Sequence, residues 1–108
     1  MKSYQKFFKL IFFEFYRPQY VSEFWSGLFS FWKEKRGRDA NQYQQFLETI
    51  LFKFNASVNH YMFFGGTNFG FMNSEGVITS YDYDAPLTED GNYGKKYWKA
   101  KQTIGNKV

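Results

Sequence analysis

The feature that most constrains this chain is an amphipathic segment between two short, apolar ones. From Asn41 to Phe54, apolar side chains recur at helical spacing and make one continuous face. The members of that face are Tyr43, Phe46, Leu47, Ile50, Leu51 and Phe54. Two segments are rich in β-branched and aromatic residues, as strands are: the first half of residues 19–25, and residues 57–64. This strand–helix–strand order predicts two parallel strands joined by a right-handed crossover.

Two parallel strands do not make a stable sheet alone, because parallel sheets need cover on both faces. The chain has 108 residues, whereas a complete (β/α)₈ barrel takes about 250. The sequence therefore predicts a slice of an α/β protein rather than a finished barrel.

Three further segments complete the expected order. An amphipathic helix over residues 7–16 comes first; it makes a poor signal peptide and is too short to span a bilayer. Residues 67–85 show no helical or strand period and predict a long loop, of the kind that usually serves function. The last helix is predicted over 93–104, with Tyr97, Trp98 and Ile104 facing inward and its lysines mostly outward.

The ends of the central helix carry their own signals. Asn41 and Gln44 form the expected capping pair, and Asp39 favours the helix N-terminus. Asn55 is expected to close the helix in a left-handed conformation. The triplet at 55–57, Asn-Ala-Ser, fits the N-glycosylation pattern. We expect it to be unused, because the helix there gives way to a buried strand.

Composition excludes several kinds of chemistry. The chain has no Cys and one His, so disulfides, thiolate metal sites and Cys nucleophiles are excluded, and a zinc site is not expected. The net charge is +4, and one tight basic cluster stands out: Lys33, Lys35, Arg36 and Arg38. An anionic partner such as nucleic acid is one interpretation of that cluster. A solvated loop before a helix is the favoured one.

The candidate chemical residues are one carboxylate and two phenols. Glu23 ends the first strand, where active sites form in α/β sheets, and aromatic residues follow it at once. A carboxylate among rings suits attack on a sugar's anomeric carbon, although an ordinary surface Glu has the same local sequence. Tyr61 and Tyr83 are candidates to contact sugar hydroxyls or to serve only in packing. Asp82 and Asp84 do not suggest a metal pair, and we expect them to bond loop backbone.

A glycine-rich turn follows the second strand at 65–70, with the sequence GGTNFG. Its glycine spacing differs from the Walker and dinucleotide fingerprints, so phosphate binding is rejected. The glycines are expected to let the backbone turn tightly around a bulky neighbour.

Four segments in order carry a family resemblance: SEFWSG at 22–27, ASVNHYMF at 56–63, GGTNFGFMN at 65–73 and TSYDYDAPLTE at 79–89. Together they resemble the glycoside hydrolase family 35 β-galactosidases, closest to the animal β-galactosidase-like branch. The resemblance covers about residues 17–105. It implies that residues 1–108 are one partial catalytic domain.

The resemblance also implies a fold and a role for each matching position. The chain corresponds to the last two strand–helix units of a (β/α)₈ barrel. Glu23 falls on the catalytic nucleophile, and Tyr61 and Tyr83 fall on tyrosines that bind galactose. The implied reaction is hydrolysis of terminal non-reducing β-D-galactose from glycoconjugates, with retention of configuration and with no cofactor or metal. The family's members are mostly lysosomal or extracellular.

The sequence also departs from the family. The family's acid/base Glu follows an Asn, and no Asn-Glu pair occurs in these 108 residues. We therefore expect the isolated chain to be inactive and to need the missing barrel portion as a partner. Four positions near Glu23 differ from the frequent family residues: Val21, Leu28, Ser30 and Phe31. A non-catalytic carbohydrate-binding or pseudo-enzyme module is the alternative, and a basic nucleic-acid binder is a remote third.

Overall fold

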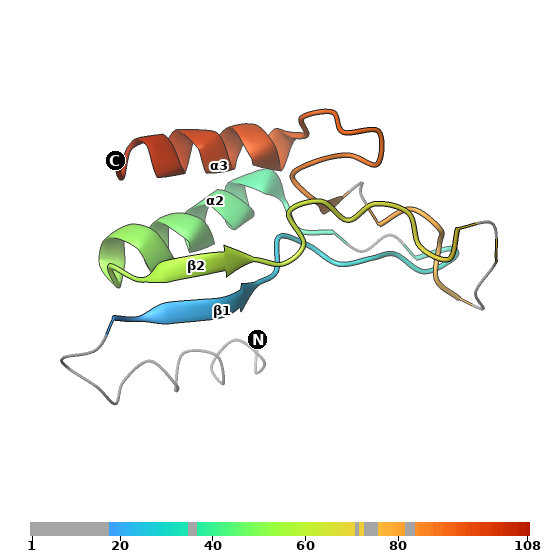
Figure 1. The fold of residues 1–108 in the computed structure, drawn as a ribbon, viewed down its shortest axis with the longest axis horizontal. Helices are drawn as coiled ribbons and strands as arrows, with labels where there is room; N and C mark the ends of the chain where they lie inside the picture. Colours follow the sequence, from blue (N-terminus) through green and yellow to red (C-terminus); the bar gives the residue numbers. More distant parts are fainter. Residues whose placement is uncertain (1–17, 35–36, 71, 73–75, 82–83) are drawn as a thin grey trace.

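The computed structural model describes residues 18–34, 37–70, 72, 76–81 and 84–108. The elements run in the order β1 (Tyr20–Phe24), α2 (Ala40–Glu48), the π-helix η1 (Thr49–Lys53), β2 (Ser57–His60) and α3 (Lys95–Gly105) (Figure 1). The helix predicted over 7–16 lies outside the described residues.

The two strands are parallel neighbours, as the strand–helix–strand order predicts. Tyr20 pairs with Ser57 and Phe24 with His60, and the register shifts between Val21 and Phe24. Because the strands are parallel, both end at the same edge of the sheet. The described part of the chain is thus an α/β arrangement with an open two-stranded sheet.

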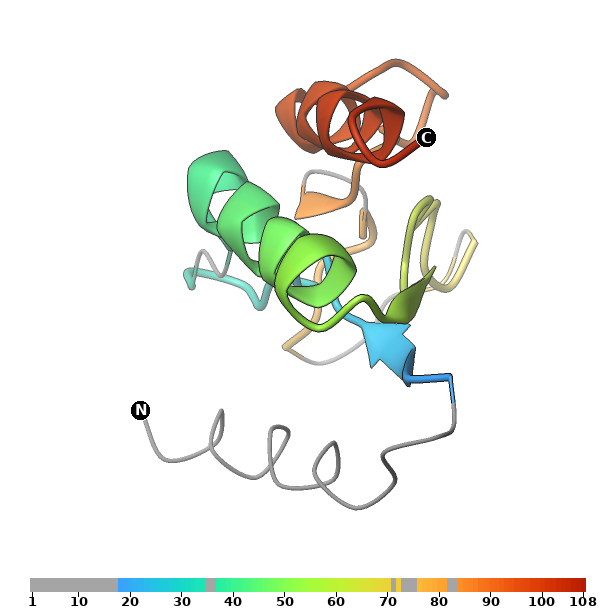
Figure 2. The same ribbon diagram turned by 90° about the vertical axis from the view of Figure 1, so that its left-hand side faces the viewer.

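The helices are stacked on this sheet. The helix α2 and its continuation η1 lie between the strands and α3, so the three tiers follow one another in both views (Figures 1 and 2). The core forms where the tiers meet, from Phe24, Tyr43, Leu47, Leu51 and Ala100. Burying these side chains is the main favourable contribution to this packing.

The start of α2 differs from the prediction. Asp39 is the N-cap, and its carboxylate accepts hydrogen bonds from the backbone of Asn41 at 2.9 Å and Gln42 at 3.1 Å. The predicted capping pair of Asn41 and Gln44 is therefore wrong, because the helix begins earlier, at Ala40. At the other end, Asn55 has φ 48°, which confirms the predicted left-handed residue.

The buried face of α3 also differs from the prediction. Lys96, Ala100 and Thr103 are buried, whereas Trp98 is 53% and Ile104 42% exposed. The helical pattern predicts that a lysine lies on the surface. Lys96 points inward instead, because its ammonium pairs with a buried carboxylate, as described below.

The second strand is shorter than expected. It ends at His60, and its side chains alternate between exposed and half-buried instead of being covered on both faces. The long loop after it is held by single bridges, including Phe31 to Val77 and Thr67 to Ser80.

The glycine turn after β2 behaves as the sequence predicts. A Cβ on Gly65 would lie 2.1 Å from the Tyr81 ring, so only glycine lets the backbone pass this bulky neighbour. Among the described residues, no helix has the length and apolarity needed to cross a membrane.

Candidate active site

Glu23 is the penultimate residue of β1, at the carboxyl edge of the sheet. Its side chain is exposed, and its Oε2 accepts a hydrogen bond from the indole Nε1 of Trp25 at 3.1 Å. The two side chains are brought together because they are two residues apart where the strand ends. The bond from Trp25 uses one carboxylate oxygen and leaves the other for further partners.

Tyr61 reaches the same place from the second strand. It follows β2 directly, and its backbone N–H donates to the carbonyl of Phe24 at 2.9 Å. Its ring centroid lies 5.7 Å from that of Trp25. The Trp25 side chain therefore contacts both Glu23 and Tyr61. Trp25 and Tyr61 are 36% and 41% exposed, so both rings remain open to solvent.

The third predicted residue, Tyr83, lies outside the described residues, as does Asp82. Its described neighbours are Tyr81 and Asp84, both buried. Burial raises the pKa of the Tyr81 hydroxyl, and the nearby Tyr61 and Asp84 raise it further. Tyr81, from the motif at 79–89, therefore lies close enough to Tyr61 for the two groups to interact electrostatically.

Asp84 is a hub of backbone hydrogen bonds, as predicted for it. Its carboxylate accepts from the N–H of Leu28 at 2.9 Å and of Arg38 at 3.2 Å. Two glycines make room for it. A Cβ on Gly27 would lie 1.6 Å from Asp84 Oδ2, and one on Gly37 would lie 3.2 Å from Oδ1. Gly27, in the segment at 22–27, therefore leaves the space that Asp84, in the segment at 79–89, occupies.

Lys96 closes this hub from α3. Its ammonium donates to the carbonyls of Ser26 and Asp84, each at 2.8 Å, and forms a buried ion pair with the Asp84 carboxylate. Burial lowers the pKa of Lys96, and the Asp84 carboxylate opposes that shift. Three oxygen partners satisfy the three donors of the ammonium.

The turn that carries Trp25 is fastened along its length. The Arg38 guanidinium donates to the Trp25 carbonyl at 2.6 Å, and the Ser26 hydroxyl donates to the Met62 carbonyl at 2.7 Å. With the bonds from Lys96 and Asp84, every residue from 25 to 28 except Gly27 bonds to a distant part of the chain, and Gly27 is pressed against Asp84. The position of Glu23's indole partner is therefore set by the hub.

The single histidine, His60, is half-buried and packs against the core below the site. The Tyr43 hydroxyl and His60 Nε2 are 2.6 Å apart, and the His60 ring packs edge-on against Phe24. Burial lowers the pKa of His60 to about 4. The imidazole is thus neutral near pH 7 and acts as a packing and hydrogen-bonding group.

The described residues contain no group of three or more acidic, His or Cys side chains arranged for a metal ion. Of the basic cluster, Lys35 and Arg36 lie outside the described part. Arg38 is committed to the protein, since its guanidinium bonds Trp25 and lies 5.3 Å over the Phe46 ring.

Sequence reasoning missed two parts of this site. It treated Trp25 only as an aromatic neighbour. An indole N–H two residues beyond Glu23 can nevertheless reach the Glu23 carboxylate. It missed the pairing of Asp84 with Lys96, because Lys96 looks like one of several surface lysines in Lys95, Lys96, Lys99 and Lys101. The glycines at 27 and 37 were the available signal, since they mark a close approach without naming its partner.

Comparison with known proteins adds the family context. The family model for glycosyl hydrolases family 35 matches residues 2–107. The chain is 43% identical over 94 residues to human Beta-galactosidase-1-like protein 3, which covers 80% of this chain and 14% of that protein. It is 42% identical over 99 residues to Beta-galactosidase 1 of Dictyostelium discoideum, covering 81% of this chain and 15% of that protein. It is 42% identical over 110 residues to the Beta-galactosidase of Xanthomonas manihotis, covering 91% and 18%. The chain therefore spans less than a fifth of the length of these relatives.

Proposed function

The chain belongs to glycosyl hydrolases family 35, and we propose from this membership that it forms part of the catalytic domain of a retaining exo-β-galactosidase. In this proposal, residues 1–108 are one part of that domain, and β1 and β2 are the last two strands of a (β/α)₈ barrel. The substrate class is glycoconjugates with a terminal non-reducing β-D-galactose.

The observation that carries the proposal is the Glu23 carboxylate at the carboxyl edge of the sheet, bonded to Trp25 beside Tyr61. Glu23 is the proposed nucleophile: its free oxygen forms a bond to the anomeric carbon while the bond to the departing oxygen breaks. The Trp25 N–H orients the carboxylate for this attack. The Tyr61 phenol lies where it can donate to the sugar or to the nucleophile, and Tyr83 is proposed as a second galactose contact.

The departing oxygen needs a proton, and a second carboxyl group supplies it in retaining glycosidases. The Asn-Glu pair that carries this group in the family is absent from the 108 residues. The acid/base group is therefore proposed to come from a part of the barrel that these residues do not include. Loss of such a group typically costs a factor of about 10² to 10⁴.

An activated fluorosugar separates the nucleophile from the missing acid. A 2-deoxy-2-fluoro-β-galactoside with a dinitrophenolate leaving group needs no protonation, so attack by Glu23 leaves a stable covalent adduct. We expect intact mass and peptide mapping to locate this adduct on Glu23 in the isolated chain. Glu23→Gln should abolish it, and Glu34→Gln, which alters another exposed carboxylate, should not. An adduct on another residue, or one that persists in Glu23→Gln, would contradict the assignment of Glu23.

A 4-nitrophenyl β-galactoside tests the second half of the proposal. Its hydrolysis is more dependent on the acid, so we expect no turnover above background by the isolated chain. Turnover that Glu23→Gln abolishes would show that a second carboxylate from outside these residues is not required.

Binding without catalysis is the second candidate function. It is favoured by the exposure of the Trp25 and Tyr61 rings, which leaves apolar faces on which a sugar can stack. It predicts galactose binding that survives Glu23→Gln and is lost in Tyr83→Ala. A flat calorimetric titration at millimolar galactose would argue against it.

A further inference from the structure

The triplet Asn55-Ala56-Ser57 is the one Asn-X-Ser/Thr pattern in the 108 residues. The sequence argued against its use, because a buried strand was expected there. The expected burial is wrong for the two residues that matter: Asn55, in the short connection from η1 to β2, and Ser57, the first residue of β2, are both exposed. We propose that Asn55 is the acceptor of an N-linked glycan and that the first sugar of this glycan packs on the Phe52 ring.

The backbone presents the Asn55 side chain at the tip of this connection. Its φ of 48° lies in the left-handed region, which Asn tolerates better than most residues. The Lys107 ammonium donates to the side-chain Oδ1 of Asn55 at 2.6 Å. An N-glycan is attached to the amide nitrogen, so this bond uses the oxygen and leaves the reacting atom unengaged by Lys107.

An exposed aromatic ring lies next to the acceptor. Phe52 is 46% exposed, and the Lys107 ammonium that bonds Asn55 lies 5.7 Å from the centroid of the Phe52 ring. Phe52, Lys107 and Asn55 therefore form one contiguous exposed cluster. The apolar face of an N-acetylhexosamine on Asn55 would cover the ring, which otherwise remains in contact with water.

The sugar donor in this transfer is an oligosaccharide linked to a lipid diphosphate. The Asn55 amide nitrogen forms a bond to the anomeric carbon of the first sugar and gives up one proton. The bond from that carbon to the phosphate oxygen breaks, and the diphosphate leaves with the electron pair. Ser57, two residues on, supplies the hydroxyl that the acceptor pattern requires.

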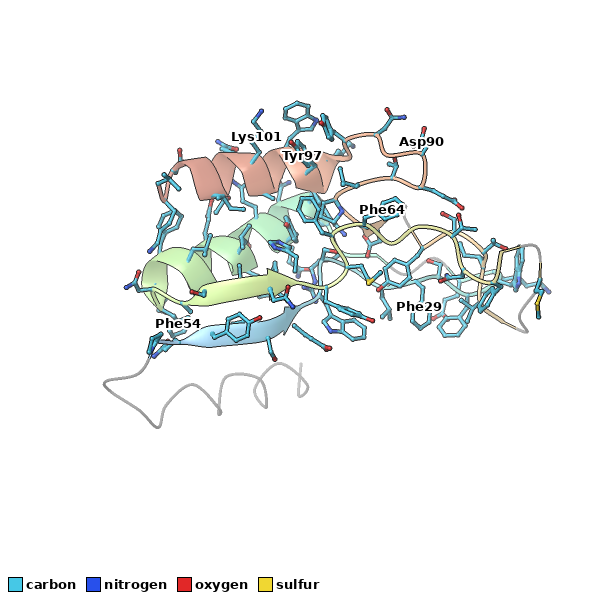
Figure 3. All side chains as sticks on the ribbon, in the orientation of Figure 1. Phe29, Phe54, Phe64, Asp90, Tyr97 and Lys101 are labelled. Carbon is cyan, nitrogen blue, oxygen red and sulfur yellow. The ribbon has the colours of Figure 1, made fainter. Side chains whose placement is uncertain are left out.

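The position leaves the candidate active site clear. Asn55 precedes β2 and Tyr61 follows it, so the two are at opposite ends of a four-residue strand that is about 13 Å long at the rise of an extended chain. In Figure 3, Phe54 lies at one end of the sheet, and Phe29 and Phe64 lie beyond the other end. The proposal does not depend on Glu23 or on galactosidase activity.

The test is production of the full 108-residue chain behind a cleavable secretion signal in eukaryotic cells. We expect a slower gel mobility that peptide N-glycosidase reverses, with conversion of Asn55 to Asp seen by mass spectrometry. Asn55→Gln and Ser57→Ala should each abolish the shift, and Ser57→Thr should keep it. Asn59→Gln, outside the pattern, is the matched control. Transfer occurs on entry to the secretory pathway, so a poorly folding variant still reports. A signal-cleaved chain without the shift would overturn the proposal.

A second measurement tests the packing on Phe52. The glycosylated chain should have a higher Tm than the enzymatically deglycosylated chain, in which residue 55 is Asp. The difference should shrink in Phe52→Ser, which keeps the acceptor pattern. An equal difference in both chains would overturn the packing of the sugar on Phe52.

Discussion

Lys96 and Asp84 form an ion pair in the interior, where each side chain is more than nine-tenths buried. One comes from α3 and the other from the loop before it, and both reach the turn that follows β1. Two segments of the family resemblance, SEFWSG and SYDYDAPL, thus meet at one point. The pair holds the backbone on which Trp25, the partner of Glu23, is placed.

Removing the lysine should be costly. Lys96→Met keeps the length of the side chain but leaves the Asp84 carboxylate buried without its cation, and such a loss costs about 3 to 5 kcal/mol of unfolding free energy. Urea denaturation followed by circular dichroism measures it. Lys101→Met, on the exposed side of the same helix, removes only a cation–π contact with the exposed Trp98 ring and should cost no more than about 1 kcal/mol. Equal effects of the two substitutions would contradict the ion pair.

Gly27 should not tolerate a methyl group. A Cβ there would lie 1.6 Å from the Asp84 carboxylate and 2.7 Å from the Asp84 backbone oxygen, and the backbone atom cannot swing away. We expect Gly27→Ala to cost about 1 to 3 kcal/mol or more in the same urea experiment. Gly105→Ala is the matched control, because nothing lies within 4 Å of its Cβ and α3 favours alanine. A neutral Gly27→Ala would mean that Asp84 is not seated against this turn.

The sequence predicts the residues that local patterns place, and it does not predict those placed by contacts with distant parts of the chain. Local periodicity was enough for α2, and the strand–helix–strand order was enough for the parallel pairing of β1 with β2. Lys96 could not be placed, because its inward position depends on Asp84, twelve residues away in the chain, and on no local pattern. Asp39 and Asn41 are both good caps, so only the backbone at Ala40 decides between them. The roles of Glu23 and Tyr61 stay predictions, and the sequence does not predict that the Trp25 indole contacts both side chains.

The bond between Trp25 and Glu23 should be visible by NMR. The indole Nε1–H of Trp25 donates to a charged carboxylate, and a charge-assisted bond shifts such a proton downfield. Glu23→Ala should move one of the three Trp indole signals upfield and leave those of Trp32 and Trp98 in place. Glu34→Gln serves as the control with another acidic residue changed. Three unmoved signals in Glu23→Ala would show that the indole does not bond Glu23.

His60 should make the fold sensitive to acid. Burial holds its folded pKa at about 4, while an unfolded histidine titrates near 6.5. Between these values the unfolded chain binds a proton that the folded chain does not, so the unfolding free energy falls as the pH falls from about 6.5 to 4. The two pKa values imply a loss of about 3 kcal/mol across that window and no further loss from this group below it.

His60→Gln cannot take up the proton and keeps an acceptor for the Tyr43 hydroxyl, so its stability should be flatter over the same range. Urea midpoints of both chains from pH 7 to 4 give the difference, which removes the contribution of the carboxylates they share. Parallel curves would mean that His60 is not buried beside Tyr43 in the folded chain.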